Sequence, residues 1–150
     1  MSPRPALSDP QWMPAARKAV DEFVAELQAG IDTADAKTYN AHFGDDVAWG
    51  SPYGATLTGY DVLHPIHRQM FSAGVTATGA SSRYETVHVM APTPDVAIAQ
   101  VRRVALDGDG QPVPIDDASA FSEMALYVLV RRDRTWWLAA GQNTPLRPKP

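Results

Sequence analysis

The pattern of apolar and polar positions divides the chain into a helical first half and a strand-rich second half. Residues 14–27 place apolar side chains at helical spacing and charged ones on the opposite face, and Gly30 suits the end of this helix. A shorter helix is predicted over residues 34–42, with Thr33 as its N-cap. A third helix is predicted to begin near Asp61.

The third predicted helix carries a buried stripe that includes one histidine. Pro65 is placed in the first turn of this helix, where its missing N–H removes no helical hydrogen bond. The stripe follows the i, i+3, i+4, i+7, i+8 spacing and consists of Leu63, Ile66, His67, Met70 and Phe71. A histidine among core residues, instead of on the solvated face, indicates a pocket.

After Gly79 the periodicity becomes that of strands. Four segments rich in β-branched and aromatic residues are separated by turn sequences: residues 83–91, 96–106, 118–132 and 135–143. The last two are predicted to form a hairpin. Helices followed by strands indicate an α+β domain, in which about three N-terminal helices pack on one face of a curved antiparallel sheet. The open end of such a cone-like sheet is a natural site for an apolar ligand.

Prolines crowd both ends of the chain and limit the predicted domain. Residues 1–13 and 145–150 are expected to be flexible tails because of these prolines. No linker or internal repeat interrupts residues 14–144, so this segment is predicted to be one domain.

Composition excludes several classes of function. The net charge is −4 and there is no basic block, which disfavours binding to nucleic acid or to an anionic membrane. No segment reaches the roughly 20 apolar residues of a membrane helix or resembles a secretory signal, so a cytoplasmic location is expected. The absence of cysteine rules out disulfides, thiolate catalysis and cysteine-ligated metals.

Metal and cofactor motifs are also missing. His64 and His67 have the i, i+3 spacing of a shared metal site, but no carboxylate at helical spacing completes a ligand set. The run from Asp107 to Gly110 resembles a calcium loop but places Ala118 where the closing glutamate belongs, so it is interpreted as a hairpin turn. No dinucleotide or flavin motif occurs, and neither a metal nor a cofactor is predicted.

A set of motifs spread over residues 14–144 is similar to one known group of small α+β proteins. The motifs are Phe43, Asp46, Gly59 followed by a helix with His67 and Phe71, and the run from Trp137 to Thr144. They resemble the SgcJ/EcaC group of the nuclear-transport-factor-2-like superfamily, which also contains ketosteroid isomerase and the SnoaL polyketide cyclases. The resemblance implies a homodimer formed through the outer sheet face. It also implies a role in natural-product biosynthesis, including enediyne antibiotic pathways.

His67 is the first candidate for chemistry. An imidazole on an apolar stripe has a perturbed pKa and can transfer a proton, with Asn143 and one of Tyr39, Tyr53 or Tyr127 orienting the substrate. The alternative is a core histidine that is hydrogen-bonded to a backbone carbonyl or to Asp46. Apolar residues are expected to wall the pocket, or else to form plain core: Tyr39, Phe43, Trp49, Met70 and Phe71.

Polar residues on the strands supply further ligand-binding candidates. Glu123 and Tyr127 share one strand face, but the opposite face is wholly apolar, so the pattern leaves open which of them lines the cavity. Arg102 and Arg103 point to opposite faces, and one of them is expected to face inward or into a dimer seam, where it can bind a carboxylate. We select Arg102 as the ligand-binding residue. Gln142 is expected to provide a neutral hydrogen-bond donor beside Asn143.

Three functions follow from these features, and the third is a structural or signalling dimer whose cone is filled and has no measurable cavity. The first is a cofactor-free enzyme that isomerises, cyclises or hydrates a hydrophobic polyketide or polyene through acid–base chemistry at His67. The second is a noncatalytic protein that binds or carries such a molecule.

Overall fold

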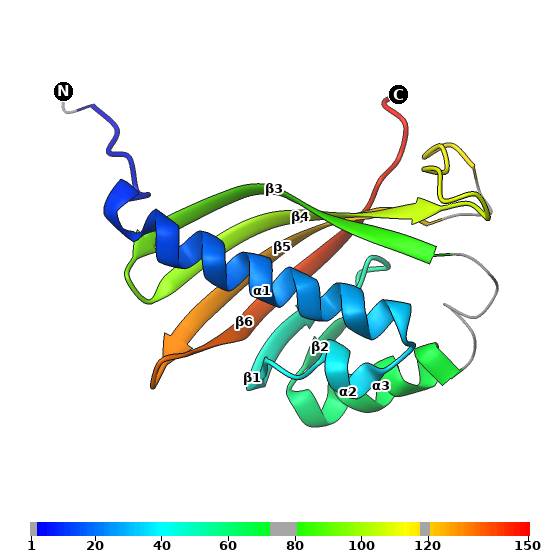
Figure 1. The fold of residues 1–150 in the computed structure, drawn as a ribbon, viewed down its shortest axis with the longest axis horizontal. Coiled ribbons are helices and arrows are strands. Elements are labelled where there is room, and N and C mark those ends of the chain that lie inside the picture. The colour runs from blue at the N-terminus through cyan, green and yellow to red at the C-terminus, as the bar shows by residue number, and fades with distance from the viewer. Residues whose placement is uncertain (1–2, 73–80, 118–120) are drawn as a thin grey trace.

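The computed structural model describes residues 3–72, 81–117 and 121–150 and shows one curved sheet with helices packed on it (Figure 1). The helical elements are η1 (Pro10–Trp12), α1 (Met13–Asp32), α2 (Ala36–Tyr39) and α3 (Tyr60–Ser72). The strands are β1 (Phe43–Gly50), β2 (Thr56–Thr58), β3 (Ser81–Thr93), β4 (Val96–Leu106), β5 (Glu123–Arg132) and β6 (Thr135–Pro145). The predicted α+β class is confirmed.

The six strands form one sheet in the order β2-β1-β6-β5-β4-β3. Every neighbouring pair is antiparallel, as predicted, except β1 and β6, which run parallel and make the sheet mixed. The predicted hairpin is confirmed between β5 and β6, and both turn residues, Asp133 and Arg134, have the positive φ that a tight hairpin requires. The first residues of the predicted strand 118–132, positions 118–120, lie outside the described residues.

The helix limits differ from the predicted ones where a local cap competes. Asp35, not Thr33, caps α2: its Oδ1 accepts hydrogen bonds from the backbone N–H of Lys37 and Thr38. The Thr33 hydroxyl instead donates to the carbonyl oxygen of Ala29, because α1 continues past Gly30 to Asp32. In α3, Pro65 lies inside the helix and beyond the first turn, contrary to the prediction.

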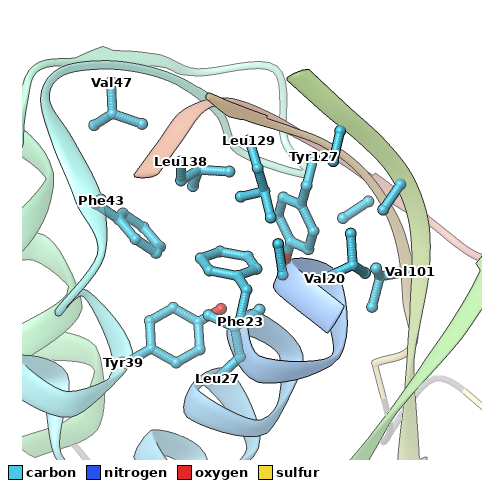
Figure 2. Packing of buried hydrophobic residues seen from close by; sticks show 14 of the residues in the cluster. Val20, Phe23, Leu27, Tyr39, Phe43, Val47, Val101, Tyr127, Leu129 and Leu138 are labelled. Carbon is cyan, nitrogen blue, oxygen red and sulfur yellow. The ribbon is translucent and has the colours of Figure 1, made fainter. Parts of the chain in front are cut away.

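The core lies between α1 and the concave face of the sheet (Figure 2). Phe23 of α1 packs edge-on against Tyr127 of β5, with ring centroids 5.4 Å apart. Gly141 of β6 leaves room for the rings on either side, since a Cβ there would lie 3.0 Å from Tyr127 and 3.1 Å from Trp49. Each fully buried leucine or aromatic residue of this cluster contributes about 1.5–3 kcal/mol to folding.

The chain also makes contacts outside residues 14–144. Ser8 and Asp9 bind the backbone of Ala91 in β3: the N–H of Asp9 donates to the Ala91 carbonyl, and the N–H of Ala91 donates to Ser8 Oγ. At the other end, the N–H of Leu146 donates to the carbonyl of Ser122. Among the described residues, no helix is both long and apolar enough to cross a bilayer.

Gly30 permits the close approach of α1 and α2, and replacing it tests the packing. A Cβ at this position would lie 2.6 Å from Tyr39 Cβ and 2.7 Å from the Tyr39 backbone. Helix propensity alone predicts that Gly30→Ala stabilises the protein by about 1 kcal/mol. We expect the opposite sign, a loss of about 1–3 kcal/mol, because the helices must separate. Urea unfolding of Gly30→Ala measures this, with Gly108→Ala as the control, since a Cβ at Gly108 meets no atom within 4 Å. A stabilised Gly30→Ala would contradict the packing argument.

Candidate functional site

His67 lies inside a cage of aromatic rings contributed by α2, β1 and its own helix, α3. It points from α3 toward the core and is buried. Two rings meet the imidazole edge-on: Tyr39 from α2 at 5.1 Å and Trp49 from β1 at 5.3 Å between centroids. Phe43 and Phe71 complete the cage, with Phe71 stacked against the imidazole. The predicted wall residues Tyr39, Phe43, Trp49 and Phe71 are therefore gathered around the predicted proton-transfer residue.

Asn40 joins His67 to a second histidine. Asn40 Oδ1 accepts a hydrogen bond from His67 Nδ1 at 2.7 Å, and Asn40 Nδ2 donates to His64 Nδ1 at 2.9 Å. His67 Nε2 has no hydrogen-bond partner among the described residues. Nε2 is not fully buried, so it retains access to solvent. The partner of His67 is thus neither a backbone carbonyl nor Asp46, which is exposed.

Burial controls the charge of His67. Desolvation, followed by the nearby His64, lowers the pKa of His67 to about 4. The imidazole is consequently neutral at pH 7, and the free lone pair on Nε2 is an acceptor for a proton or a hydrogen bond.

The depressed pKa of His67 predicts a loss of stability in acid. The unfolded chain protonates this histidine near the ordinary histidine pKa of 6.5, whereas the folded chain does so only at a pKa of about 4. The stabilisation is therefore complete above pH 6.5 and is lost as the pH falls toward 4, by roughly 3 kcal/mol. Urea unfolding at pH 7 and pH 4 measures the difference in the free energy of unfolding. In His67→Gln this difference should be smaller by the contribution assigned to His67. An equally large reduction in His88→Gln, which changes an exposed histidine of β3, would contradict the assignment to His67.

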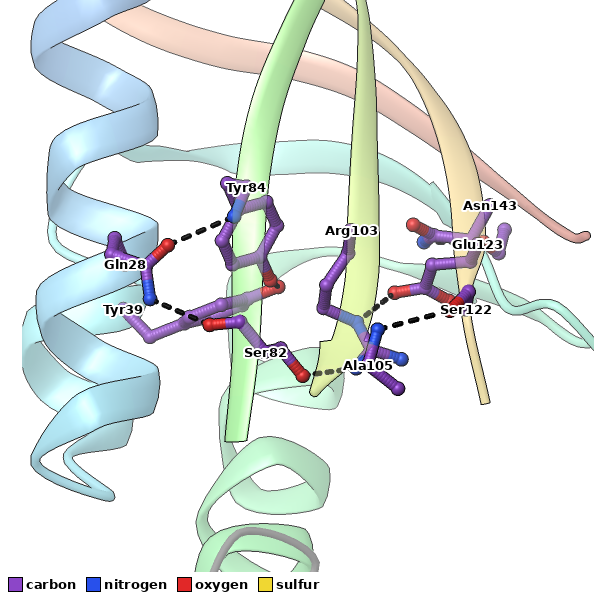
Figure 3. Close-up of polar contacts among 10 residues, drawn as sticks. Gln28, Tyr39, Ser82, Tyr84, Arg103, Ala105, Ser122, Glu123 and Asn143 are labelled. Carbon is purple, nitrogen blue, oxygen red and sulfur yellow. Dashed lines mark hydrogen bonds and ion pairs between the residues drawn. The ribbon is translucent and has the colours of Figure 1, made fainter. Parts of the chain in front are cut away.

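Three tyrosine hydroxyls gather on the concave face. The hydroxyl oxygens of Tyr39 and Tyr84 lie 3.0 Å apart (Figure 3). The hydroxyl of Tyr127 interacts electrostatically with both. Burial raises the pKa of Tyr39 to about 12 and raises the pKa values of Tyr84 and Tyr127 well above their usual range. All three stay protonated at pH 7 and can donate hydrogen bonds. Tyr84 was not identified from the sequence; its strand position among β-branched residues was the available signal.

An ion pair lies beside the tyrosines. Arg103 Nε donates to Glu123 Oε1 at 3.0 Å, and Arg103 Nη1 donates to Ser82 Oγ at 2.7 Å (Figure 3). Burial acts to lower the pKa of Arg103, but Glu123 and the neighbouring tyrosines outweigh it, so the net shift is upward. The inward-facing arginine is therefore Arg103. Arg102, the arginine selected to bind a carboxylate, lies on the outer face, 3.8 Å from Glu85.

The position of α1 shows which face of β5 points to the interior of the protein. Glu123, Ala125 and Tyr127 face the concave side that α1 covers, while Leu126 on the alternate face is exposed. Gln28 of α1 anchors the helix to the edge strand β3: its Nε2 donates to the carbonyl of Ser82 and its Oε1 accepts from the N–H of Tyr84 (Figure 3).

Asn143 is buried on the concave face with half of its amide unpaired. Its Nδ2 donates to the carbonyl of Gly50 at 3.0 Å, while Oδ1 has no partner among the described residues. An unpaired buried acceptor costs about 1–3 kcal/mol, which makes Oδ1 a candidate to accept a hydrogen bond from a ligand. The neighbouring Gln142 points to the outer face, is exposed, and its Nε2 donates to the Asn143 carbonyl.

Tyr53 and Met70 are predicted site residues that also lie away from the cage. Tyr53 does not share a strand with Trp49, because β1 ends at Gly50 and the following residues turn. Tyr53 is 83% exposed and stacks on Phe121, with ring centroids 5.8 Å apart. Met70 is 42% exposed, so the predicted buried stripe of the third helix narrows to Leu63, His67 and Phe71.

His67 lines neither of two surface depressions formed by the described residues. A groove of about 730 Å³ runs between the start of β1 and the β5–β6 turn region, with Asp45, Tyr60, Arg132 and Trp137 among its lining residues. A smaller depression of about 480 Å³ lies on the outer side of α2 and α3 and is lined in part by His64. No three histidine, aspartate or glutamate side chains in the described ranges gather closely enough to hold a metal.

Comparison with known proteins identifies the fold. No family model and no curated protein matches the sequence. A domain of unknown function with a cystatin-like fold from Nostoc punctiforme PCC 73102 matches with a TM-score of 0.75 at 18% identity, covering 89% of this chain and 79% of its own. An NTF2-like protein of unknown function from Pseudomonas putida KT2440 matches with a TM-score of 0.68 at 16% identity, covering 87% of each chain.

A third similar structure carries the name of an enzyme. A ketosteroid isomerase-like protein from Erwinia carotovora matches with a TM-score of 0.65 at 16% identity, covering 87% of this chain and 96% of its own. Identities this low show the fold alone. The chain has the cystatin-like or NTF2-like α+β fold.

Proposed function

We propose that this protein binds a hydrophobic small molecule on the concave side of its sheet and catalyses a cofactor-free proton transfer on it. The observation that carries the proposal is the caged, neutral imidazole of His67, which Asn40 holds with Nε2 free. A fixed, neutral base beside protonated tyrosines is suited to isomerisation, cyclisation or hydration.

Each group on the concave face has a distinct role in this proposal. His67 Nε2 takes a proton from the ligand, and the hydroxyl of Tyr39 or Tyr127 donates a hydrogen bond to the oxygen where negative charge develops. Asn143 Oδ1 accepts a hydrogen bond from a ligand hydroxyl. Of the three tyrosines expected to orient the substrate, Tyr39 contacts the His67 ring and Tyr127 is buried, whereas Tyr53 is exposed and has no part in this proposal.

A noncatalytic carrier is the second candidate, and one observation favours it. The concave carboxylate, Glu123, is already paired with Arg103, so it is not free to act as a base. A histidine with a pKa of about 4 is also a weak base at pH 7. In that case the aromatic cage and Asn143 would hold a ligand without changing it.

The ligand class that we propose is a polyketide or polyene intermediate of natural-product biosynthesis. Support comes from the aromatic cage, which suits a conjugated apolar molecule, and from the likeness of the sequence motifs to the SgcJ/EcaC group. Membership of that group, and a place in an enediyne pathway, are part of this proposal.

Ligand capture tests the function directly. The purified protein is incubated with an extract of an enediyne-producing actinomycete and analysed by native mass spectrometry, and the bound and released molecules are identified. A molecule released with altered mass or connectivity supports the enzyme. A molecule released unchanged supports the carrier, and the absence of any capture contradicts both proposals.

We further propose a homodimer formed through the outer face of the sheet. Leu126 is 46% exposed at the centre of this face and lies between Gln100 and Gln142 of the neighbouring strands. Ile98 and Val128 pair beside it and are half-buried. Sedimentation should give twice the chain mass, and Leu126→Glu should shift the equilibrium to monomer, because it places a charge in an apolar interface. A wild-type monomer at micromolar concentration would contradict the dimer.

A further inference from the structure

The amide of Asn40 assigns the proton positions of two histidines. An amide oxygen can only accept hydrogen bonds and an amide nitrogen can only donate them. His67 must therefore carry its proton on Nδ1, which donates to Asn40 Oδ1, and His64 must present a bare Nδ1 to Asn40 Nδ2. The free nitrogen of His67, Nε2, is consequently an acceptor in this arrangement.

The two histidines differ in their exposure to solvent. His67 and Asn40 are buried, whereas His64 is half-buried and lines the depression on the outer side of α2 and α3. The three side chains thus connect a solvent-accessible imidazole to the imidazole inside the aromatic cage.

We propose that Asn40 and His64 are positioning residues that set the tautomer of His67, and that protonation of His64 converts His67 Nε2 from hydrogen-bond acceptor to donor. This inference rests on the role proposed above for His67. The inference adds that His64, which lies outside the cage, controls whether His67 Nε2 accepts or donates a hydrogen bond.

The change follows from hydrogen-bond complementarity. When His64 gains a solvent proton on Nδ1, that N–H faces the N–H of Asn40 Nδ2, and two buried donors oppose each other. A half-turn of the Asn40 amide relieves this, because Oδ1 then accepts from His64 and Nδ2 donates to His67 Nδ1. His67 must release its proton from Nδ1 and take one on Nε2, the nitrogen with solvent access, so its net charge does not change.

The surroundings of His64 differ from those of His67. Desolvation lowers the pKa of His67 to about 4, so this buried imidazole stays neutral down to mildly acid pH. The ring of Tyr60 stacks on His64 with centroids 5.0 Å apart, and β2 contains no titratable residue. Among the described residues, the charged groups that line the same depression as His64 are Asp35 and Lys37 from α2 and its N-cap, and Arg68 from α3, while His67 acts on it electrostatically.

The tautomer exchange has a direct consequence for chemistry. With His64 neutral, Nε2 of His67 accepts a proton or a hydrogen bond from the ligand. With His64 charged, Nε2 donates to a ligand oxygen instead. The same cage then changes from base to hydrogen-bond donor without a change in the charge of His67.

Nitrogen NMR of the ligand-free protein tests this inference. The chain has four histidines, and long-range proton–nitrogen correlation spectra distinguish a protonated ring nitrogen from a bare one at each. We expect His67 to carry its proton on Nδ1 at pH 8 and on Nε2 at a pH below the titration of His64. A His67 that keeps its Nδ1 proton throughout the titration of His64 would overturn the inference.

Two variants check the parts of the network, and His88→Gln serves as the control. His64→Phe keeps a ring against Tyr60 but cannot gain a proton, so the His67 tautomer should not change with pH. Asn40→Asp offers a carboxylate that accepts from both rings, so both histidines should keep Nδ1 protonated. A pH-dependent His67 tautomer in either variant would overturn the inference.

The NMR readout separates this inference from the proposed function. The NMR measurement requires neither ligand nor turnover. If the tautomer exchange is observed but the captured ligand is released unchanged, the enzyme proposal fails and the inference about the histidine network stands. Where turnover is found, His64→Phe should remove the low-pH change in rate that the wild type and His88→Gln show. Persistence of that change in His64→Phe would count against the inference.

Discussion

Replacing His67 by glutamine should lower turnover of the captured ligand by about 10²–10⁴-fold, because the variant lacks the lone pair that accepts the proton. Glutamine keeps a side-chain amide that can bond to Asn40, and the aromatic rings around it are unchanged. Ligand affinity should therefore change much less than the rate. Single-turnover kinetics and a separate binding titration measure the two effects.

The matched control for His67→Gln is His88→Gln. His88 lies on β3 and is exposed, so the same chemical change there should leave both rate and affinity unaltered. If His67→Gln keeps the full rate while binding is intact, the imidazole does not transfer the proton and the carrier proposal gains. If His67→Gln and His88→Gln lose activity equally, the loss is not caused by removing the imidazole from the aromatic cage.

The sequence predicted the elements that local patterns determine. Residues 96–106 were predicted as a strand and form β4 with those limits, because β-branched and apolar residues dominate the segment and turn residues bound it on both sides. The α2 cap was misplaced because Thr33 and Asp35 are both good caps. The choice depends on how far α1 extends, and contact between Gly30 and Tyr39 decides that.

The site was predictable only in part, because its geometry depends on contacts distant in sequence. His67 could be found from helical spacing, since a helix face is a local property. The alternation of side chains along a strand could not identify Arg103 as the inward-facing arginine. Alternation puts Arg102 and Arg103 on opposite faces of the sheet but does not say which face α1 covers. Asn40 gave no signal at all, since its partners His64 and His67 are 24 and 27 residues away.

Replacing Arg103 by methionine should lower the free energy of unfolding by about 3–5 kcal/mol, because it leaves a buried carboxylate without its partner. The side chains of Arg103 and Glu123 are only 17% and 13% exposed, so solvent screens their interaction little. Methionine fills most of the volume of the arginine stem but cannot donate to Glu123 or to Ser82 Oγ. Urea unfolding at pH 7 measures the loss.

A second variant separates the unpaired charge from the lost packing. Arg103→Met combined with Glu123→Gln leaves no buried charge, so it should recover most of the stability that Arg103→Met loses. Purely additive losses would show that the pair does not interact and that the effect comes from packing. Recovery in the double variant would indicate that Arg103 is retained to neutralise Glu123. That neutralisation leaves His67 as the unpaired proton acceptor in the cage and makes the effect of His67→Gln the decisive one for catalysis.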